Sequence, residues 1–380
     1  MPSRKVLLKA FSSGIAALVA TSFILASAHA ADPINIGSVM DLSGPVATLG
    51  QYAKRGADVA VKEINAAGGI NGRPLELISL NSESKPDLAA SLGLRVASRS
   101  DVLAIIGGNF GSTQYALGAL AEKQKVPFVT PTGLVTDAQR TWSYCYFTLV
   151  DFSDVAKVML DYARKKGYKR IGLMRLEREY GELGSKFLHK YAPDYGIEIV
   201  AEERGADGDR DFTAQLSKIR DAKPDFIVVW FANPGGSLVL KNAKQIGIST
   251  PMIAPVSMDS VATVKLAGPA AEGLILAAQI ASGEALDRQK AFVAGYAAAF
   301  PETPKPNSFE AAGYDVVKII AAALKTMKEP YTRESLRDAI GKLSYDGAGA
   351  IIRYSATKND PMSDTIVLTQ IKGGEFVLAR

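Results

Sequence analysis

Glycines and hydroxyl side chains gather in two loops of the sequence, where they could hold an anion. One loop is Gly107–Gln114, which opens a predicted helix, and the other is Thr130–Thr136. The first N–H groups of a helix lack intrahelical acceptors and lie at the positive end of the helix dipole. Together with the hydroxyls of Ser112 and Thr113, they could bind a carboxylate. Ser112 could equally serve only as the N-cap of this helix.

Two further loops could contribute to the same site. Asp41–Pro45 follows the first predicted strand, and Glu177–Gly181 follows the first predicted strand of a second α/β region. Ligands of open α/β sheets bind at the carboxyl ends of the strands, and all four loops fall there. Tyr180 could form a pocket wall or pack in the core, and its position before Gly181 favours the pocket wall.

The side chains that most enzyme chemistry needs are missing from this sequence. It has one Cys and two His, and it contains no G-x-S-x-G elbow, P-loop, H-E-x-x-H motif or dinucleotide fingerprint in strand–helix context. His189 is predicted to lie on a helix surface, and Glu177 with Glu179 fits a solvated turn better than a glycosidase pair. We therefore expect no enzyme activity, and no metal or organic cofactor is required.

The composition is that of a globular protein with enough residues for two domains. The chain has 380 residues, 47% of them hydrophobic and 22% charged, which excludes disordered, collagenous and coiled-coil proteins. Residues 1–30 are predicted to be a cleaved signal peptide, because basic residues precede the apolar run Phe11–Leu25 and Ala28–Ala30 fits a cleavage site. The run is shorter than the ~20 residues of a membrane anchor. Without residues 1–30 the formal charge falls from +5 to +2, which does not suggest nucleic-acid binding.

Strand-like and helix-like segments alternate along the rest of the chain, which predicts two α/β lobes with doubly wound parallel sheets. The passage Trp142–Phe147 is predicted to be irregular, and Lys372–Gly374 is predicted to form a hairpin turn. Strands are expected at Ile34–Met40, Leu75–Leu80, Val102–Ile106, Val126–Thr130, Arg170–Met174, Glu198–Glu202, Phe226–Phe231 and Gly273–Ala277. Helices are expected around Ala53–Ile64, Asp87–Ser98, Ser112–Lys123, Ser153–Lys166, Tyr180–Tyr191, Leu286–Phe300, Phe309–Lys325 and Arg333–Gly341.

Several sequence phrases resemble the periplasmic branched-chain amino-acid-binding proteins of ABC importers, and the resemblance covers nearly all of the chain after residue 30. The most specific phrase is Gly68–Pro74, which reads Gly-Gly-Ile-Asn-Gly-Arg-Pro. The other matching phrases are Ile34–Gly37, Ser43–Pro45, Ile106–Gly108, Val126–Pro131, Asp211–Thr213, Lys218–Arg220 and Pro224–Phe226.

The resemblance implies a type I periplasmic-binding fold, in which two lobes joined by three hinge crossings close on one solute. Lobe 1 would comprise residues 31–149 and about 280–350, and lobe 2 would comprise 150–279 and about 351–380. The protein would be a periplasmic monomer that delivers a hydrophobic amino acid, or a related small carboxylate, to an inner-membrane ABC permease. Two alternatives remain: a carboxylic acid without an α-amino group as the solute, or a periplasmic ligand sensor.

The resemblance also implies which residues bind the solute. The loops that hold the carboxylate fall at Phe110–Thr113 and Thr132–Leu134, and Tyr180 matches an aromatic residue of the second lobe. Two aromatic positions of the family fall at Leu49 and near Phe231 or Ala232, and the acidic residue that neutralises the ammonium falls at Val256. An ammonium buried without a counter-charge is costly. Either Asp259 or another acid substitutes, or the solute has no α-ammonium. The implied ligand-binding residues are Leu49, Phe110, Ser112, Thr113, Thr132, Gly133, Leu134, Tyr180, Phe231 and Val256.

Overall fold

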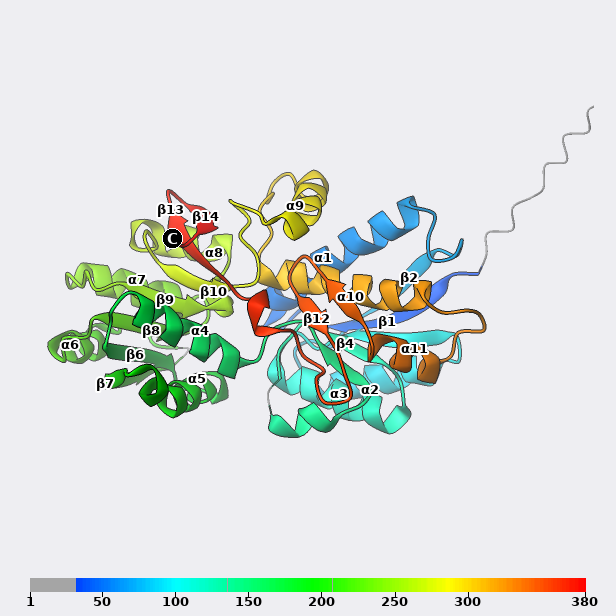
Figure 1. Cartoon of the computed structure of the whole chain (residues 1–380), viewed down its shortest axis with the longest axis horizontal. Coiled ribbons are helices and arrows are strands. Elements are labelled where there is room, and N and C mark those ends of the chain that lie inside the picture. The colour runs from blue at the N-terminus through cyan, green and yellow to red at the C-terminus, as the bar shows by residue number, and fades with distance from the viewer. Residues whose placement is uncertain (1–31, 135, 207) are drawn as a thin grey trace, which may run out of the picture. The chain divides into compact units, whose positions relative to one another are not determined.

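The computed structural model describes residues 32–134, 136–206 and 208–380, so the predicted signal peptide lies outside the described residues. Residues from Asp32 onward form one unit built on two large sheets (Figure 1). The predicted fold class, α/β with parallel sheets and helices on both faces, is confirmed.

The first sheet has five parallel strands in the order β2-β1-β3-β4-β5. Its strands are β1 (Ile34–Met40), β2 (Leu75–Asn81), β3 (Val102–Gly107), β4 (Phe128–Thr130) and β5 (Cys145–Phe147). β5 lies in the passage predicted to be irregular, so that prediction is wrong for these three residues. A strand of this length is too short to show periodicity, and it forms because Phe128 and Thr130 provide a buried partner strand.

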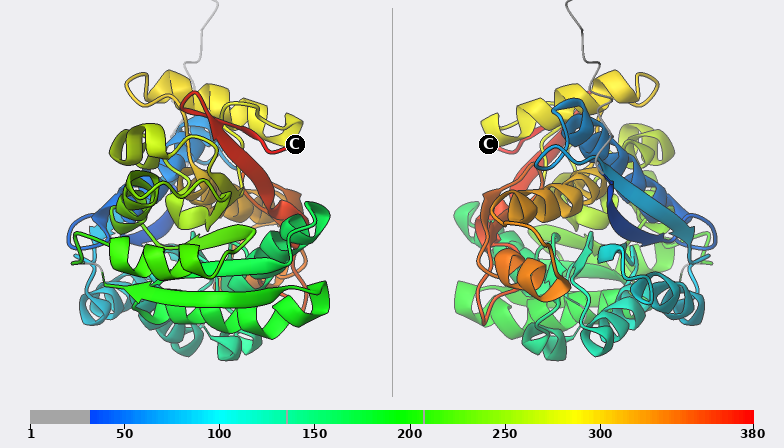
Figure 2. Two further views of the ribbon diagram at one scale, coloured as in Figure 1. Left: turned by 90° about the vertical axis from the view of Figure 1, so that its left-hand side faces the viewer. Right: turned by 90° about the vertical axis from the view of Figure 1, so that its right-hand side faces the viewer.

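Helices cover both faces of the first sheet because its strand residues alternate between two apolar clusters. Ile36 and Met40 pack with one group of helices, and Val39 and Ile105 pack with the other. The first group is α1 (Ala47–Ala66), α9 (Asp287–Ala299), α10 (Ser308–Lys325) and α11 (Arg333–Ile340); the second is α2 (Pro86–Ala97) and α3 (Gly111–Gln124). α1 and α10, distant in sequence, lie side by side (Figure 2).

The second sheet has seven strands in the order β14-β13-β10-β9-β8-β6-β7. The strands β6 to β10 are parallel, whereas β13 and β14 are antiparallel and form the predicted hairpin. The strands are β6 (Arg170–Leu176), β7 (Glu198–Gly205), β8 (Phe226–Trp230), β9 (Met252–Pro255), β10 (Ile275–Ala278), β13 (Val367–Lys372) and β14 (Glu375–Leu378). The residues Ile227 and Val229 face one cluster and Val228 and Trp230 face the other, so this sheet too is covered on both faces.

The helices of the second sheet divide between these two clusters. The cluster around Trp230 contains α4 (Phe152–Lys165) and α5 (Glu179–Tyr191), and the opposite cluster contains α6 (Thr213–Asp221), α7 (Gly235–Gln245) and α8 (Val261–Ala267). The remaining elements are the small sheet of β11 (Ser344–Asp346) and β12 (Ile351–Arg353), and the 3-10 turns η1 (Asp137–Thr141), η2 (Ala192–Tyr195), η3 (Val256–Met258), η4 (Gly268–Ala270) and η5 (Ser363–Thr365).

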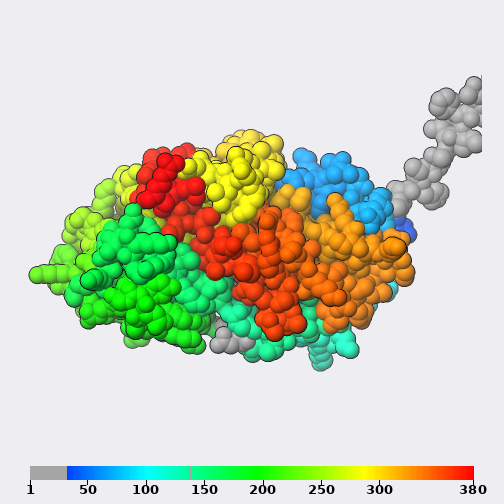
Figure 3. Space-filling model, viewed as in Figure 1, coloured from blue at the N-terminus to red at the C-terminus, as the bar shows by residue number. Residues whose placement is uncertain are grey.

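The chain passes between the two sheets three times. The crossings are residues 148–151 between β5 and α4, residues 279–286 between β10 and α9, and residues 354–366 between β12 and β13. Figure 3 shows the residues that follow α11, coloured orange to red, along one face as they run toward β13 and β14. The limits of the two predicted lobes stay a prediction.

Candidate functional site

The loop after β3 is held in place by the buried carboxylate of Asp41, which follows β1. One carboxylate oxygen accepts hydrogen bonds from the backbone N–H of Asn109 at 2.9 Å and from the Thr113 hydroxyl at 2.8 Å. The other oxygen accepts a hydrogen bond from the Ser82 hydroxyl. Asp41 and Thr113 are both fully buried. The Thr113 hydroxyl therefore holds the loop in place, and the backbone N–H groups and the exposed Ser112 hydroxyl are the groups of this loop that can donate to an anion.

The start of α3 provides those backbone donors. Phe110 is the N-cap, with an extended backbone, and the N–H of Gln114 is the donor to its carbonyl at 2.8 Å. The N–H groups between these two residues precede the first intrahelical bond, as expected at a helix start. Ser112 is exposed in the first turn of the helix, so the alternative that Ser112 is only the N-cap is wrong.

The loop after β4 lies against the first crossing between the sheets. The Thr132 hydroxyl lies 3.0 Å from the Thr130 hydroxyl, which itself donates to the carbonyl of Gly108. The backbone N–H of Leu149 donates to the carbonyl of Thr132 at 3.1 Å. Gly133 and Leu134 are buried. The two predicted anion loops are therefore in direct contact with each other.

Apolar residues from both sheet regions meet near these loops. Val256 in η3 belongs to a buried apolar cluster, and Leu49 on α1 packs against that cluster, so two predicted site residues some two hundred positions apart lie at the same place. The other members are Leu149, Phe309 and Ala312, with Tyr52 packed against them. Sequence reasoning missed Tyr52 and Phe309. Tyr52 could have been found, because it follows Leu49 by three residues and shares its helix face.

Tyr180 contributes a half-buried aromatic ring from the start of α5. Its ring packs edge-on against Phe152 at a centroid distance of 5.3 Å and lies 6.0 Å from Trp230. Its hydroxyl lies 2.7 Å from that of Ser257, which donates to the carbonyl of Phe231. Burial raises the pKa of Tyr180, so the phenol stays neutral.

The ring of Phe231 does not join this aromatic group. It is fully buried on the other face of the second sheet, edge-on to Phe212 at 5.4 Å. Its neighbour Trp230 is the residue that packs beneath Tyr180. Adjacent residues of a strand face opposite sides of the sheet, so the side chain next to Tyr180 comes from position 230 and not from position 231.

Asp259, the acid considered as a substitute counter-charge, is hydrogen-bonded to the start of a helix. One of its oxygens accepts hydrogen bonds from both the backbone N–H and the hydroxyl of Ser308, the first residue of α10. Burial raises the pKa of Asp259 to about 7, despite the favourable hydrogen bonds. Asp259 follows β9 of the second sheet, whereas α10 packs on the first sheet. This carboxylate therefore links the two sheet regions.

Residues 33–375 match the family described as periplasmic binding protein. The chain belongs to this family. A leucine-, isoleucine-, valine-, threonine- and alanine-binding protein from Pseudomonas aeruginosa is 26% identical over 339 residues, which cover 86% of this chain and 90% of the relative. A Leu/Ile/Val-binding protein from Escherichia coli K12 is 24% identical over 270 residues, which cover 70% and 72% of the two chains. The resemblance seen in the sequence is thereby confirmed.

Solved structures share the fold of this periplasmic binding protein. A branched-chain amino acid transporter substrate binding protein from Streptococcus pneumoniae, in complex with isoleucine, superimposes with a TM-score of 0.81 at 25% identity, covering 91% of this chain and 99% of its own. A periplasmic binding protein type 1 from Bordetella pertussis Tohama I superimposes with a TM-score of 0.78 at 22% identity, covering 92% and 100%.

A buried glutamine joins two of the three crossings of this periplasmic binding protein. The Gln279 side chain donates to the carbonyls of Thr148 and Gly349, both at 2.9 Å, and accepts a hydrogen bond from the N–H of Val150 at 3.1 Å. Gly349 lies in the turn between β11 and β12, where the buried carboxylate of Asp315 accepts three backbone hydrogen bonds. Sequence reasoning missed both residues, since a single buried amide leaves no local pattern.

Three general features of the described residues complete the description. Within residues 32–134, 136–206 and 208–380, no helix is long and apolar enough to cross a membrane. The same ranges contain no group of three or more His, Cys, Asp or Glu side chains arranged to hold a metal ion. The single Cys145 is buried and unpaired in this part of the chain.

Proposed function

We propose that this periplasmic binding protein captures a hydrophobic amino acid, or a related small carboxylate, and delivers it to an inner-membrane ABC permease. The observation that carries the proposal is the meeting of two donor loops, Phe110–Thr113 and Thr132–Leu134, with the apolar cluster that contains Val256 and packs against Leu49. This combination suits a solute with one carboxylate and one apolar group. The relatives are named as proteins that bind leucine, isoleucine and valine, which supports the same solute class.

Each part of the site has a chemical role in this proposal. The N–H groups at the start of α3 would hold the solute carboxylate at the positive end of the helix dipole. The apolar side chain would pack among Leu49, Val256 and Phe309. Burial of a leucine-sized side chain contributes about 1.5–3 kcal/mol. Tyr180 would close the site from the second sheet region.

Binding would be coupled to a movement of the two sheet regions about the three crossings. A solute that touches both regions binds the closed arrangement better than the open one and shifts the population toward it. The hydrogen bonds between Asp259 and Ser308, and the apolar cluster that contains Val256 and Phe309, join the two regions in the present arrangement. These contacts would break and form again as the solute enters and leaves.

The remaining parts of the proposal concern location and chemistry. We infer that residues 1–30 direct export and are then cleaved, so the mature chain acts in the periplasm as a monomer. We also infer that it is not an enzyme. The inference is supported by the lack of catalytic motifs in the sequence and by membership of a family named for binding. A periplasmic sensor of the same fold is the competing function.

A binding screen tests the proposed solute. The mature chain, unfolded and refolded to remove any bound solute, would be screened by thermal shift against leucine, isoleucine, valine and the deaminated leucine analogue 4-methylpentanoate. A solute at 100 times its dissociation constant adds ~2.7 kcal/mol of stability, which raises the melting temperature of a chain of this size by several degrees.

The outcomes of this screen separate the candidates. A response to the amino acids and not to 4-methylpentanoate supports the proposal. In that case a residue other than Val256 must neutralise the solute ammonium. A response to 4-methylpentanoate alone assigns the site to acids without an α-amino group. Binding without solute uptake, in cells that carry the cognate permease genes, would favour the sensor.

A further inference from the structure

Asp259 lies at the edge of the apolar cluster of the proposed solute site. It directly follows η3, which begins at Val256, and it is hydrogen-bonded to Ser308, the residue before Phe309. Val256 and Phe309 both belong to the cluster. Tyr52, which packs against the cluster from α1, is an electrostatic neighbour of Asp259. Asp259 is therefore placed beside the position that the apolar part of a solute would take.

The protein uses only one of the two carboxylate oxygens of Asp259. Both hydrogen bonds from Ser308, that of its backbone N–H at 3.0 Å and that of its hydroxyl, go to Oδ2. Oδ1 has no hydrogen-bond partner in the part of the chain that the structure describes, and it is not one of the fully enclosed polar atoms there. The residue as a whole is only 3% exposed. The free oxygen therefore opens into a small space inside the protein, where a bound group can reach it.

No cation balances the charge of Asp259. Among the described residues, no Lys, Arg or His side chain lies within ion-pair distance of it. The guanidinium of Arg55 is paired with Glu310 at 2.5 Å, and Glu310 also accepts a hydrogen bond from the Tyr296 hydroxyl. The titratable neighbours of Asp259 are Glu310 on α10 and Tyr52 on α1, and neither is a cation. Burial, with a smaller effect from Glu310, raises the pKa of Asp259 to about 7, so its carboxyl group is mostly protonated at pH 6.

The other buried carboxylates within the described ranges are satisfied by the protein itself. Some have hydrogen bonds to both oxygens, and these are Asp41 and Asp315. The rest pair with Arg or Lys side chains, and these are Asp151, Glu310 and Asp360. Within the same ranges, Asp259 is thus the buried carboxylate that combines a free oxygen with the lack of a cation.

We propose that the free oxygen of Asp259 binds the α-ammonium of the solute, so that the site takes α-amino acids and releases a proton when it binds them. The inference rests on the proposed function and narrows its solute class. The three groups of an α-amino acid then each have a partner: the carboxylate has the two donor loops, the apolar side chain has the cluster, and the ammonium has Asp259.

The proton balance follows from the charge of the pair. The carboxyl group of Asp259 gives its proton to the solvent, and the carboxylate that forms pairs with the solute ammonium, so the site stays neutral. An opposite charge within about 4–6 Å favours the ionised form of a carboxyl group. Affinity should rise with pH, because the unbound carboxyl group must lose its proton before it can form the pair.

Calorimetry of leucine binding measures the proton directly. The mature chain, unfolded and refolded to remove any bound solute, would be titrated in pairs of buffers that differ in their enthalpy of ionisation. We expect release of roughly 0.9 proton per leucine at pH 6 and roughly 0.1 at pH 8, as for a group with a pKa of about 7 that ionises fully on binding. Leucine should bind at least 10-fold more tightly at pH 8 than at pH 5.5.

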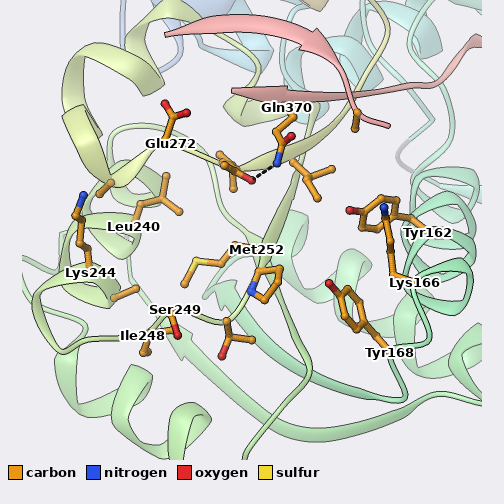
Figure 4. A pocket seen from close by; sticks show the side chains of 18 of the residues that line it. Tyr162, Lys166, Tyr168, Leu240, Lys244, Ile248, Ser249, Met252, Glu272 and Gln370 are labelled. Carbon is orange, nitrogen blue, oxygen red and sulfur yellow. Dashed lines mark hydrogen bonds between the residues drawn. The ribbon is translucent and has the colours of Figure 1, made fainter. Parts of the chain in front are cut away.

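Two variants test the residue. Asp259→Asn keeps the shape of the side chain and an acceptor for Ser308, but it has no charge to offer. It should abolish the proton release and weaken leucine binding at pH 8 at least 10-fold, and it should leave binding of 4-methylpentanoate within 2-fold. Glu272→Gln is the control. It removes a carboxylate from the pocket at the other end of the second sheet's strands (Figure 4), where Glu272 accepts a hydrogen bond from the N–H of Gly373 at 3.0 Å, and leucine binding should stay within 2-fold.

The outcomes separate this inference from the proposed function. Leucine binding with the same proton release at pH 6 and pH 8, or with an equal effect of both variants, would overturn the inference and leave the proposed function standing. Binding of 4-methylpentanoate alone would also overturn it, and would assign the site to acids without an α-ammonium. If neither the hydrophobic amino acids nor 4-methylpentanoate bound, the proposed function itself would be wrong. The proton count on the original chain gives a result even if Asp259→Asn does not fold.

Discussion

At the scale of single residues, the buried carboxylate of Asp41 holds the loop that we propose to bind the solute carboxylate. It accepts hydrogen bonds from Asn109 and Thr113. Both bonds would weaken in Asp41→Asn, because the acceptor loses its negative charge. A buried hydrogen bond to a charged group is worth about 1.5–3 kcal/mol. We expect Asp41→Asn to weaken solute binding roughly 10-fold or more by calorimetry. Asp58→Asn, on the exposed face of α1, should leave the dissociation constant unchanged.

Gly133 lets the loop after β4 pack closely against the first crossing. A Cβ atom at this position would lie 2.8 Å from the carbonyl of Val150 in the first crossing, closer than a Cβ normally comes to any atom. Gly133→Ala must therefore push the loop away from the crossing, at a cost of about 1–3 kcal/mol in the free energy of unfolding. Chemical denaturation would measure the loss. Gly208→Ala is the control, since a Cβ there meets no atom within 4 Å, and an equal loss in both variants would contradict the argument.

At the scale of elements, the first turn of α10 is bound to the region after β9 by Asp259. The pKa of Asp259 is raised by burial to about 7 from 3.8, so folding favours its protonated form. Its contribution to stability is therefore complete below about pH 4 and is lost as the pH rises toward 7. The loss is at most roughly 4 kcal/mol, at 1.36 kcal/mol for each unit of pKa.

Comparison of the chain with Asp259→Asn isolates this effect from the other buried carboxyl groups. Urea unfolding at pH 4.5 and pH 7.5 should show a larger fall in stability for the original chain than for the variant, which cannot ionise at this position. The pKa of Asp315 is also raised by burial, to about 6, but it is present in both proteins and cancels. Identical pH dependence of the two proteins would show that Asp259 does not carry the effect.

At the scale of the whole molecule, Gln279 joins the first and second crossings through one side-chain amide. In Gln279→Ala the carbonyls of Thr148 and Gly349 and the N–H of Val150 would lose their partner. Each buried unsatisfied group costs about 1–3 kcal/mol, so we expect a loss of several kcal/mol in the free energy of unfolding. Movement between open and closed arrangements should also change, which stopped-flow measurement of solute binding would detect.

Two variants complete this test. Gln279→Glu keeps the shape of the side chain but cannot donate to both carbonyls at neutral pH, so it should resemble Gln279→Ala. Gln370→Ala removes the half-buried glutamine that donates to the carbonyl of Gly273 alone, and it should cost less than 1.5 kcal/mol. If Gln279→Ala were as mild as Gln370→Ala, the amide would not hold the crossings together.

Local sequence patterns by themselves were enough to predict the positions of most strands and of the loops at their ends. The continuous apolar run at Phe226–Trp230 is buried on both faces, and such a run can be recognised without knowing its neighbours. The anion loop after β3 was predictable for the same reason, since glycines and hydroxyls at a strand end precede a helix within a few residues. The predicted carboxylate loops are therefore found next to each other in the structure.

Only the tertiary structure decided which side chains lie at the proposed site. Trp230 and Phe231 are neighbours in sequence, yet packing places Trp230 beneath Tyr180 and Phe231 in the opposite core. The Thr113 hydroxyl, available in the sequence, is bound by Asp41. Contacts of this kind join residues tens to hundreds of positions apart, and their energies depend on burial and geometry. The local sequence pattern of a segment reflects only the period of its own helix or strand, so it does not contain information about such long-range contacts.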